Sequence, residues 1–103
     1  MSFFKKLFSS SPKEPEAAKR EDPVEYEGVS IVAAPIPAEG KQWRLAGFIV
    51  KYTPEGDLER EFIRADVFYS REEAAEFAIS KGKQVVDQQG DRIFADGAPT
   101  GRC

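Results

Sequence analysis

Apolar residues in the middle of the chain recur in short runs that are rich in β-branched and aromatic side chains. Three such runs cover residues 26–34, 42–53 and 58–69. Side chains of these types favour extended backbone, so each run predicts a β-strand. The second and third runs are separated by Thr53-Pro54-Glu55-Gly56-Asp57, which is typical of a turn. We therefore expect these two strands to form an antiparallel hairpin.

The stretch that follows the third run has the signals of a helix. Ser70 and Glu73 match the capping box that begins many helices, in which the two side chains satisfy free backbone amides. Gly90 stands where a helix-ending residue with positive φ belongs, so the helix is predicted over residues 71–89. Gly82 lies inside this helix, and its missing side chain predicts a close approach of the helix backbone to the sheet.

The order of these elements predicts an α+β domain. We expect an antiparallel sheet of three or four strands with one C-terminal helix packed on one face (β-β-β-α). Ile93 and Phe94 either return to the core or form the fourth strand. The domain is expected to cover residues 24–95, after a flexible N-terminal tail of residues 1–23 and before a loose end of residues 96–103.

The N-terminal tail begins with apolar and basic side chains at the spacing of a short amphipathic helix. These are Phe3, Phe4, Leu7 and Phe8 beside Lys5 and Lys6. Such a segment can touch an anionic membrane surface or a groove of a partner protein, or it can be a frayed or locally packed terminus. Residues 9–23 are rich in Ser, Pro and charged side chains, which is the composition of a solvated linker.

Side-chain alternation divides the predicted hairpin into two faces. With residues 55 and 56 at the turn, the pairing places Phe48 opposite Ile63 and also places Trp43 opposite Phe68. One face is small and apolar, and we expect it to receive the helix; it consists of Ala46, Phe48, Val50, Ile63, Ala65 and Val67. The other face mixes large apolar residues with cations; it consists of Trp43, Leu45, Ile49, Phe62, Lys51, Arg60 and Arg64.

One helix covers one face of so small a sheet, so the second face is expected to meet the N-terminal tail, a second copy of the chain or a ligand. The candidate binding face is made of aromatic and basic residues, namely Trp43, Arg44, Lys51, Arg60, Phe62, Arg64 and Phe68. Rings beside Arg and Lys occur in protein interfaces and also in single-stranded nucleic-acid platforms. The pattern leaves open a homodimer, another protein partner and a nucleic acid.

The composition excludes several kinds of active site. Histidine is absent, which removes the Ser-His-Asp and Cys-His arrangements and the usual zinc ligands. Cys103 is the single cysteine, so no intramolecular disulfide and no cysteine zinc cluster can form. We therefore predict no enzyme activity, no catalytic residue, no metal and no cofactor.

Length and charge describe a small acidic domain. The chain has 103 residues, of which 41% are hydrophobic and 32% charged, as in one soluble domain. No apolar run is long enough for a bilayer or for secretion, so a cytoplasmic protein is expected. Residues 23–103 hold 10 basic and 14 acidic residues, a net charge of −4, which argues against direct DNA binding. The predicted helix has no second helix beside it, so a DNA role would have to use strands, a dimer or the basic tail.

Four segments carry a family resemblance. They are residues 1–8 (MSFFKKLF), 43–47 (WRLAG), 62–66 (FIRAD), and the helix with its exit, from 70–74 (SREEA) through 87–92 (DQQGDR). With these segments the chain resembles the small bacterial HlyU family, whose members are named as transcriptional activators of haemolysin. The resemblance implies a bacterial cytoplasmic regulator of transcription with a small non-enzymatic binding domain. The alternative is a protein-interaction or homodimerisation module with no direct DNA contact.

The last of these segments invites two interpretations. Asp87-Gln88-Gln89-Gly90-Asp91-Arg92 offers amides, carboxylates and a flexible glycine, which a binding site could use. The same residues can simply end a helix, with Gly90 as its cap and Asp91 and Arg92 paired locally.

Overall fold

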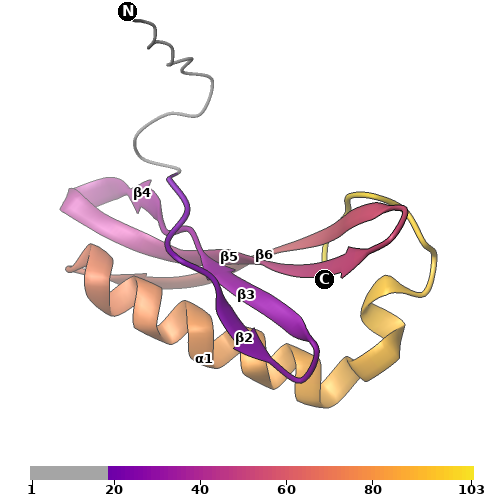
Figure 1. Ribbon diagram of the computed structural model, residues 1–103. Coiled ribbons are helices and arrows are strands. Elements are labelled where there is room, and N and C mark those ends of the chain that lie inside the picture. Colours follow the sequence, from indigo (N-terminus) through magenta and orange to yellow (C-terminus); the bar gives the residue numbers. More distant parts are fainter. Residues whose placement is uncertain (1–18) are drawn as a thin grey trace, which may run out of the picture.

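The computed structural model describes residues 19–103, so our expectations for the amphipathic start and for most of the linker lie outside the described residues. The described elements are, in order, β2 (Val24–Tyr26), β3 (Val29–Ala33), β4 (Ile36–Ala38), η2 (Glu39–Lys41), β5 (Gln42–Thr53), β6 (Gly56–Phe68), α1 (Arg71–Gln89) and η3 (Gly90–Phe94). The strands form one antiparallel sheet, and α1 lies along one of its faces (Figure 1). The α+β class with a single C-terminal helix is therefore confirmed. None of the helices within residues 19–103 has the length and apolar character that a membrane crossing requires.

A short hairpin takes the place of the predicted first strand. β2 pairs with β3, with Tyr26 opposite Val29. The two residues between them, Glu27 and Gly28, have φ values of 49° and 84°, and two positive φ values are what a type I′ hairpin turn requires. The prediction of one strand over 26–34 missed this turn because Glu-Gly is a less common turn pair than Asn-Gly or Asp-Gly.

β5 is the central strand of the sheet. It pairs with β6 along one edge and with both β3 and β4 along the other. Ala33 of β3 lies opposite Gly47, and Ile36 of β4 lies opposite Arg44, so the two short strands follow each other along the same edge. Pro37 fits β4 because no further strand of the described chain pairs with the outer side of β4. Within residues 19–103 the sheet thus has five strands, more than we expected, since β2 and β4 add to the three main strands.

The β5–β6 hairpin turns at residues 54 and 55, one position earlier than predicted. Proline suits the first central position of a turn because its ring holds φ near −65°. Phe48 consequently lies opposite Glu61, and the prediction that it faces Ile63 is wrong.

A bulge in β6 restores the predicted pairing further along the hairpin. Between Arg44 and Ala46 the register shifts, and β6 contributes two extra residues there. Because side chains alternate with a period of two, an even insertion leaves each side chain on its predicted face. Trp43 lies opposite Phe68, as predicted.

The helix has the predicted limits, and the Ser70 half of the predicted capping box is present. α1 runs from residue 71 to residue 89. The Ser70 hydroxyl accepts a hydrogen bond from the Glu73 amide at 3.2 Å. The Gly90 amide, at a φ of 54°, donates to the carbonyl of Val86.

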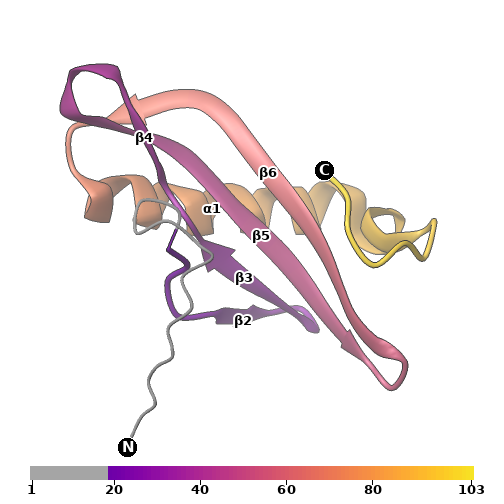
Figure 2. The ribbon, with the colours of Figure 1, turned by 90° about the horizontal axis from the view of Figure 1, so that it is seen from above.

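α1 packs on the face of the sheet that we expected to stay open, and this prediction is wrong. Ile31, Ile49 and Phe62 are fully buried in the core that α1 covers. The strands cross the helix obliquely (Figure 2), and the helix turns its smallest residues toward the sheet, which are Ala74, Ala78 and Gly82. A β-carbon at position 82 would stand 2.4 Å from Ile31 Cγ2, which confirms the close approach. Large sheet side chains fill the space that a small helix face leaves, so size complementarity decided the face.

Both ends of the described chain are fastened to the sheet. At the start, the Arg20 guanidinium lies 3.8 Å from the ring centre of Phe48 and pairs with Glu59 at 2.8 Å. At the end, residues 99–103 run beside β6 and form three backbone hydrogen bonds and a parallel bridge with it. The expectation of a loose end over 96–103 is corrected by these bonds.

Candidate functional site

The aromatic residues of the predicted binding face do not form an exposed platform. Phe62 is fully buried. Phe68 is half-buried and stacks on Phe77 of α1, with ring centres 4.9 Å apart. Trp43 is also half-buried, and the Arg71 guanidinium lies 5.5 Å from its ring centre. These rings therefore contact α1, because α1 occupies their face of the sheet.

The four cations of the predicted face differ in burial and surroundings, although the Arg64 guanidinium lies 6.0 Å from the ring centre of Phe62. Arg44 lies on the opposite face of the sheet, because side chains alternate along β5. Arg64 is half-buried and donates to the carbonyl of Ile63 at 3.2 Å. Lys51 is exposed near the turn end of β5, whereas Arg60 is buried. The seven residues do not form the continuous surface that we expected, and a binding role for any one of them stays a prediction.

Arg60 is bound within the protein itself. Its Nε donates to the carbonyl of Ile93 at 3.0 Å, and its Nη1 donates to the carbonyls of Glu59 and Ala98 at 2.7 and 2.9 Å. Its Nη2 pairs with Asp96 Oδ1 at 2.6 Å. A buried guanidinium needs such partners, and here four hydrogen bonds supply them. Arg60 thereby joins β6 to the chain that follows α1.

Asp96 is the carboxylate of this cluster. Its Oδ1 accepts a hydrogen bond from the Ala98 amide at 3.0 Å as well as the bond from Arg60. The hydrogen bond from Ala98, and then the positive charge of Arg60, hold the pKa of Asp96 below its ordinary value, although partial desolvation opposes them. The carboxylate is therefore ionised at neutral pH and ties the chain after η3 to β6.

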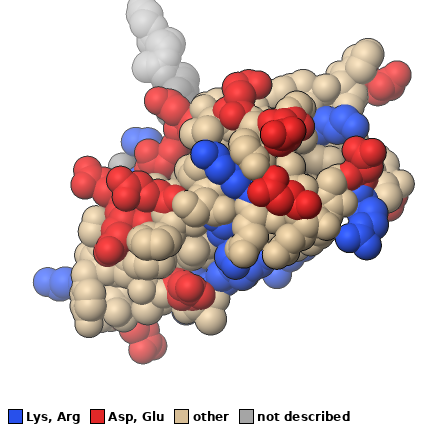
Figure 3. Space-filling model, turned by 90° about the horizontal axis from the view of Figure 1, so that it is seen from below, with Lys and Arg blue, Asp and Glu red and all other residues tan. Residues whose placement is uncertain are grey.

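Other arginines of the described chain are also paired with carboxylates. The pairs are Arg20 with Glu59, Arg71 with Glu21, and Arg102 with Glu61. Acidic and basic side chains lie beside one another over the helix side of the molecule, and the described residues show no continuous basic patch there (Figure 3). Four arginines of the described chain are thus paired with neighbouring carboxylates.

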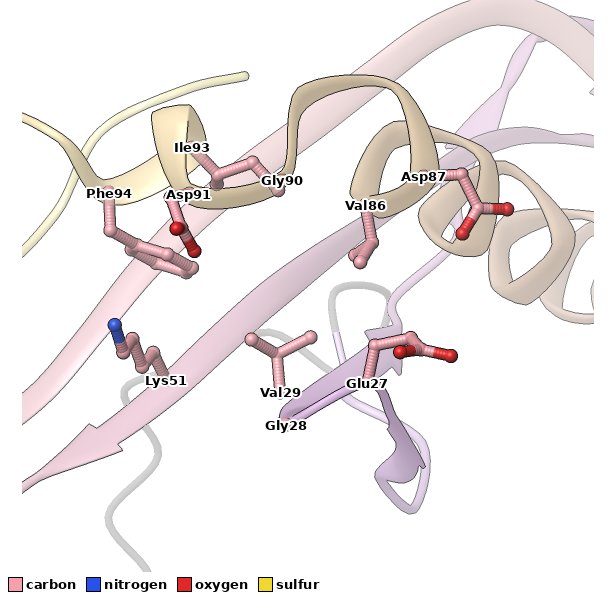
Figure 4. Close-up of a pocket in the computed structure, with 10 residues that line it drawn as sticks. All are labelled: Glu27, Gly28, Val29, Lys51, Val86, Asp87, Gly90, Asp91, Ile93 and Phe94. Atoms are coloured by element: carbon pink, nitrogen blue, oxygen red, sulfur yellow. The ribbon is translucent and has the colours of Figure 1, made fainter.

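A pocket of about 490 Å³ lies where the end of α1 meets the β2–β3 turn (Figure 4). It is lined by Glu27 and Gly28 of the turn, Val29 of β3, Val86 and Asp87 of α1, Gly90, Asp91, Ile93 and Phe94 of η3, and Lys51 of β5. Positive φ values at Glu27, Gly28 and Gly90 bend the backbone at two of its walls. We call this site the helix-end pocket.

Charged groups surround the apolar lining of the helix-end pocket. Figure 4 shows Lys51 and Asp91 toward one side and Glu27 and Asp87 toward the other. Asp87 accepts a hydrogen bond from the Tyr26 hydroxyl at 2.7 Å, and this bond raises the pKa of the tyrosine. No group of three or more His, Cys, Asp or Glu side chains within residues 19–103 is placed to hold a metal ion. The pocket is therefore suited to pair with a cationic group and to cover an apolar one.

Most of the chain matches one protein family. The model of a family described as "Transcriptional activator HlyU" matches residues 2–94. The chain belongs to the HlyU family. The description of this family implies a regulator of transcription. No curated protein and no solved structure matches the chain significantly.

The family match includes every residue that lines the helix-end pocket of this HlyU-family chain. Asp87, Gly90 and Asp91 come from the run that carried the resemblance in the sequence, where a site and a simple helix end were both open. Sequence reasoning missed Glu27 and Gly28. A Glu-Gly pair between two apolar runs was the signal that could have identified them as a turn.

Cys103 of the HlyU-family chain lies beyond the matched residues. It is half-buried and packs against the core. Burial raises the pKa of its thiol, and the positive charges of Arg64 and Arg60 partly oppose this effect. A thiol with a raised pKa is mostly protonated at neutral pH and hence a poor nucleophile.

Proposed function

We propose that this HlyU-family chain is a non-enzymatic regulator of transcription that acts in the cytoplasm by binding another protein. The family supports the regulatory role. The choice of a protein partner rests on one observation: several arginines of the described chain bind groups within the protein itself. Arg60 is 2% exposed and bound to the chain after α1, and three further arginines of the described chain pair with carboxylates.

The charge of the described residues favours a protein partner over DNA. Residues 19–103 contain 12 Lys or Arg and 16 Asp or Glu. Phosphate contacts by free Lys and Arg supply much of the affinity of proteins for DNA. α1 is the only α-helix in this range, and Glu72 and Glu73 occupy its first turn, where a recognition helix would meet the DNA.

The helix-end pocket supports the same choice. The carboxylates of Glu27, Asp87 and Asp91 outnumber the single cation of the pocket, Lys51, so the net charge of the lining repels phosphate and attracts cations. A lysine or arginine of a partner protein combines an apolar stem with a charged end. Such a side chain matches an apolar lining with a carboxylate rim, so we place a basic side chain of the partner in this pocket.

A DNA-binding measurement tests the choice of partner. Deletion of the gene in its own bacterium, followed by transcript sequencing, identifies the regulated promoters. The purified full chain is then titrated into labelled fragments of these promoters at about 50 mM salt, and binding is followed by fluorescence anisotropy. We expect changed transcripts and no saturable DNA binding. Saturable, salt-dependent binding would overturn the protein partner, and unchanged transcripts would overturn the regulatory role.

A charge reversal tests the pocket. Asp91→Lys places a cation at the rim, and we expect it to reduce the transcript response about tenfold without changing the urea midpoint, because Asp91 is exposed. Asp57→Lys in the β5–β6 hairpin is the matched control, since Asp57 is also exposed but does not line the pocket. Equal responses of the two variants would count against the pocket.

A further inference from the structure

We propose that the outer edge of β6 binds an extended, basic segment of a partner protein as an added strand, and that residues 99–103 occupy this edge until the partner displaces them. The inference rests on the proposed function for its class of partner, a protein chain. It concerns a different surface from the helix-end pocket, and we call this surface the β6 edge.

The β6 edge already carries an extended segment. The amide of Glu59 donates to the carbonyl of Pro99 at 2.9 Å, and the amide of Glu61 donates to the carbonyl of Gly101 at 2.8 Å. The Cys103 amide donates in return to the carbonyl of Glu61 at 3.0 Å. Strand addition uses the same alternation of donors and acceptors. The backbone of β6 is thus positioned to accept a strand at this place.

Few other contacts from residues 19–98 hold the segment on the edge. Residues 99–102 are exposed. The Arg102 guanidinium stands 3.8 Å from Glu61, and exposed ion pairs contribute little. Cys103 is half-buried and adds a small apolar contact. A competing strand therefore has to replace three backbone hydrogen bonds and little else.

The anchor of the C-terminal chain lies before the displaceable segment. Arg60 binds the carbonyls of Ile93 and Ala98 and the carboxylate of Asp96. All three groups precede residue 99. Departure of residues 99–103 leaves these bonds in place, so the fold can open the edge without losing the Arg60 cluster.

The side chains beside the β6 edge define the chemistry of the partner. A hollow of about 280 Å³ is lined by Phe48, Glu59, Glu61 and residues 100–102. Glu59 is already paired with Arg20, so Glu61 is the carboxylate that selects a cation. The chain itself places Arg102 beside Glu61. A partner segment with Lys or Arg at that position reproduces this contact, and its backbone reproduces the strand bonds.

A peptide titration tests the proposal. The probe is a peptide with the sequence of residues 97–102 followed by serine, and the receptor is the full chain with Arg102→Glu, in which repulsion from Glu61 weakens the internal segment. We expect amide NMR signals of Glu59 and Glu61 to shift on titration and their hydrogen exchange to slow. The unsubstituted chain should bind the peptide several-fold more weakly, because its own segment competes. A peptide that also carries Arg102→Glu should bind about fivefold more weakly.

Three results would overturn the proposal. The first is a folded Arg102→Glu chain whose Glu59 and Glu61 signals do not respond to the peptide. The second is an equal gain in peptide binding from Arg92→Glu, since Arg92 is exposed and is not paired with Glu61. The third is a dimer of the unsubstituted chain in sedimentation that Arg102→Glu abolishes, which would assign the edge to a second copy. None of these results involves promoters or transcripts. The β6-edge proposal can therefore fail while the proposed function still stands, because the proposed function is tested by separate measurements.

Discussion

At the scale of single residues, Arg60 shows how burial changes the role of a charged side chain. Removing a guanidinium from water costs several kcal/mol, which must be offset by hydrogen bonds and an opposite charge. Three carbonyls and the Asp96 carboxylate do this, and the ring of Phe94 lies 5.0 Å from the guanidinium. Arg60, which the sequence placed in the candidate binding face, instead links β6 to η3.

Arg60→Met should lower the free energy of unfolding by about 3 kcal/mol, because it leaves the partners of a buried cation unsatisfied. Urea denaturation measures this loss. Arg92→Met is the control, since Arg92 is exposed and, within residues 19–103, donates to the carbonyl of Gln88 alone, at 3.3 Å. The control should change stability by less than about 0.5 kcal/mol. A similar loss in both variants would contradict the role of Arg60.

Asp96 should make stability depend on pH in the acid range. Its pKa is lower in the folded chain than in the unfolded chain, so folding favours the ionised form. The contribution is complete above the ordinary carboxyl pKa and is lost as pH falls through the lower folded value. Asp96→Asn should therefore lower stability at neutral pH and make the decline between about pH 5 and pH 2 less steep. Urea midpoints at successive pH values test this, with Asp57→Asn as the exposed control; an unchanged slope for Asp96→Asn would contradict it.

At the scale of elements, the contact between α1 and β3 depends on a missing side chain. Gly82 lets the helix backbone approach Ile31, whose branched side chain fills the space. Glycine lowers helix propensity by roughly 1 kcal/mol, so the sequence accepts a weaker helix for a closer contact.

Gly82→Ala should destabilise the protein by about 1–2 kcal/mol although it improves the helix. The added β-carbon would meet Ile31 Cγ2 at 2.4 Å, and overpacking of this kind typically costs about 1–3 kcal/mol, which exceeds the propensity gain. Ser80→Ala is the matched control, because Ser80 is an exposed residue of α1. Thermal unfolding compares the two variants, and a more stable Gly82→Ala protein would disprove the close approach.

At the scale of the whole molecule, β5 holds the fold together. It has strand partners along both edges and α1 against one face. β2 and residues 99–103 lie at the margins, and within the described chain each of them lies beside one strand. Stability should therefore decrease from β5 outward.

Hydrogen exchange measured by mass spectrometry should show this gradient. Peptides from β5 should exchange slowest, because their amides open only when the sheet unfolds. Peptides from β2 and from residues 99–103 should exchange faster by orders of magnitude, since they can detach locally. Equal protection of residues 99–103 and β5 would contradict both this order and the displaceable segment at the β6 edge.

The sequence by itself determined the features that depend on neighbouring residues. The limits of α1 followed from Ser70, Glu73 and Gly90, because caps act on backbone groups within one turn. The grouping of side chains into two sheet faces also followed, because alternation is a property of any strand. The family was expected from local segments and is confirmed by the match over residues 2–94.

Only the tertiary structure decided which face α1 covers, what Arg60 binds and where the helix-end pocket forms. Each of these depends on residues that are far apart in the chain, such as Gly82 with Ile31 or Arg60 with Asp96. The energies of close packing and of charge burial depend on which residues surround a side chain in the folded protein. A pattern along the sequence does not show which distant residues become neighbours, because folding brings them together.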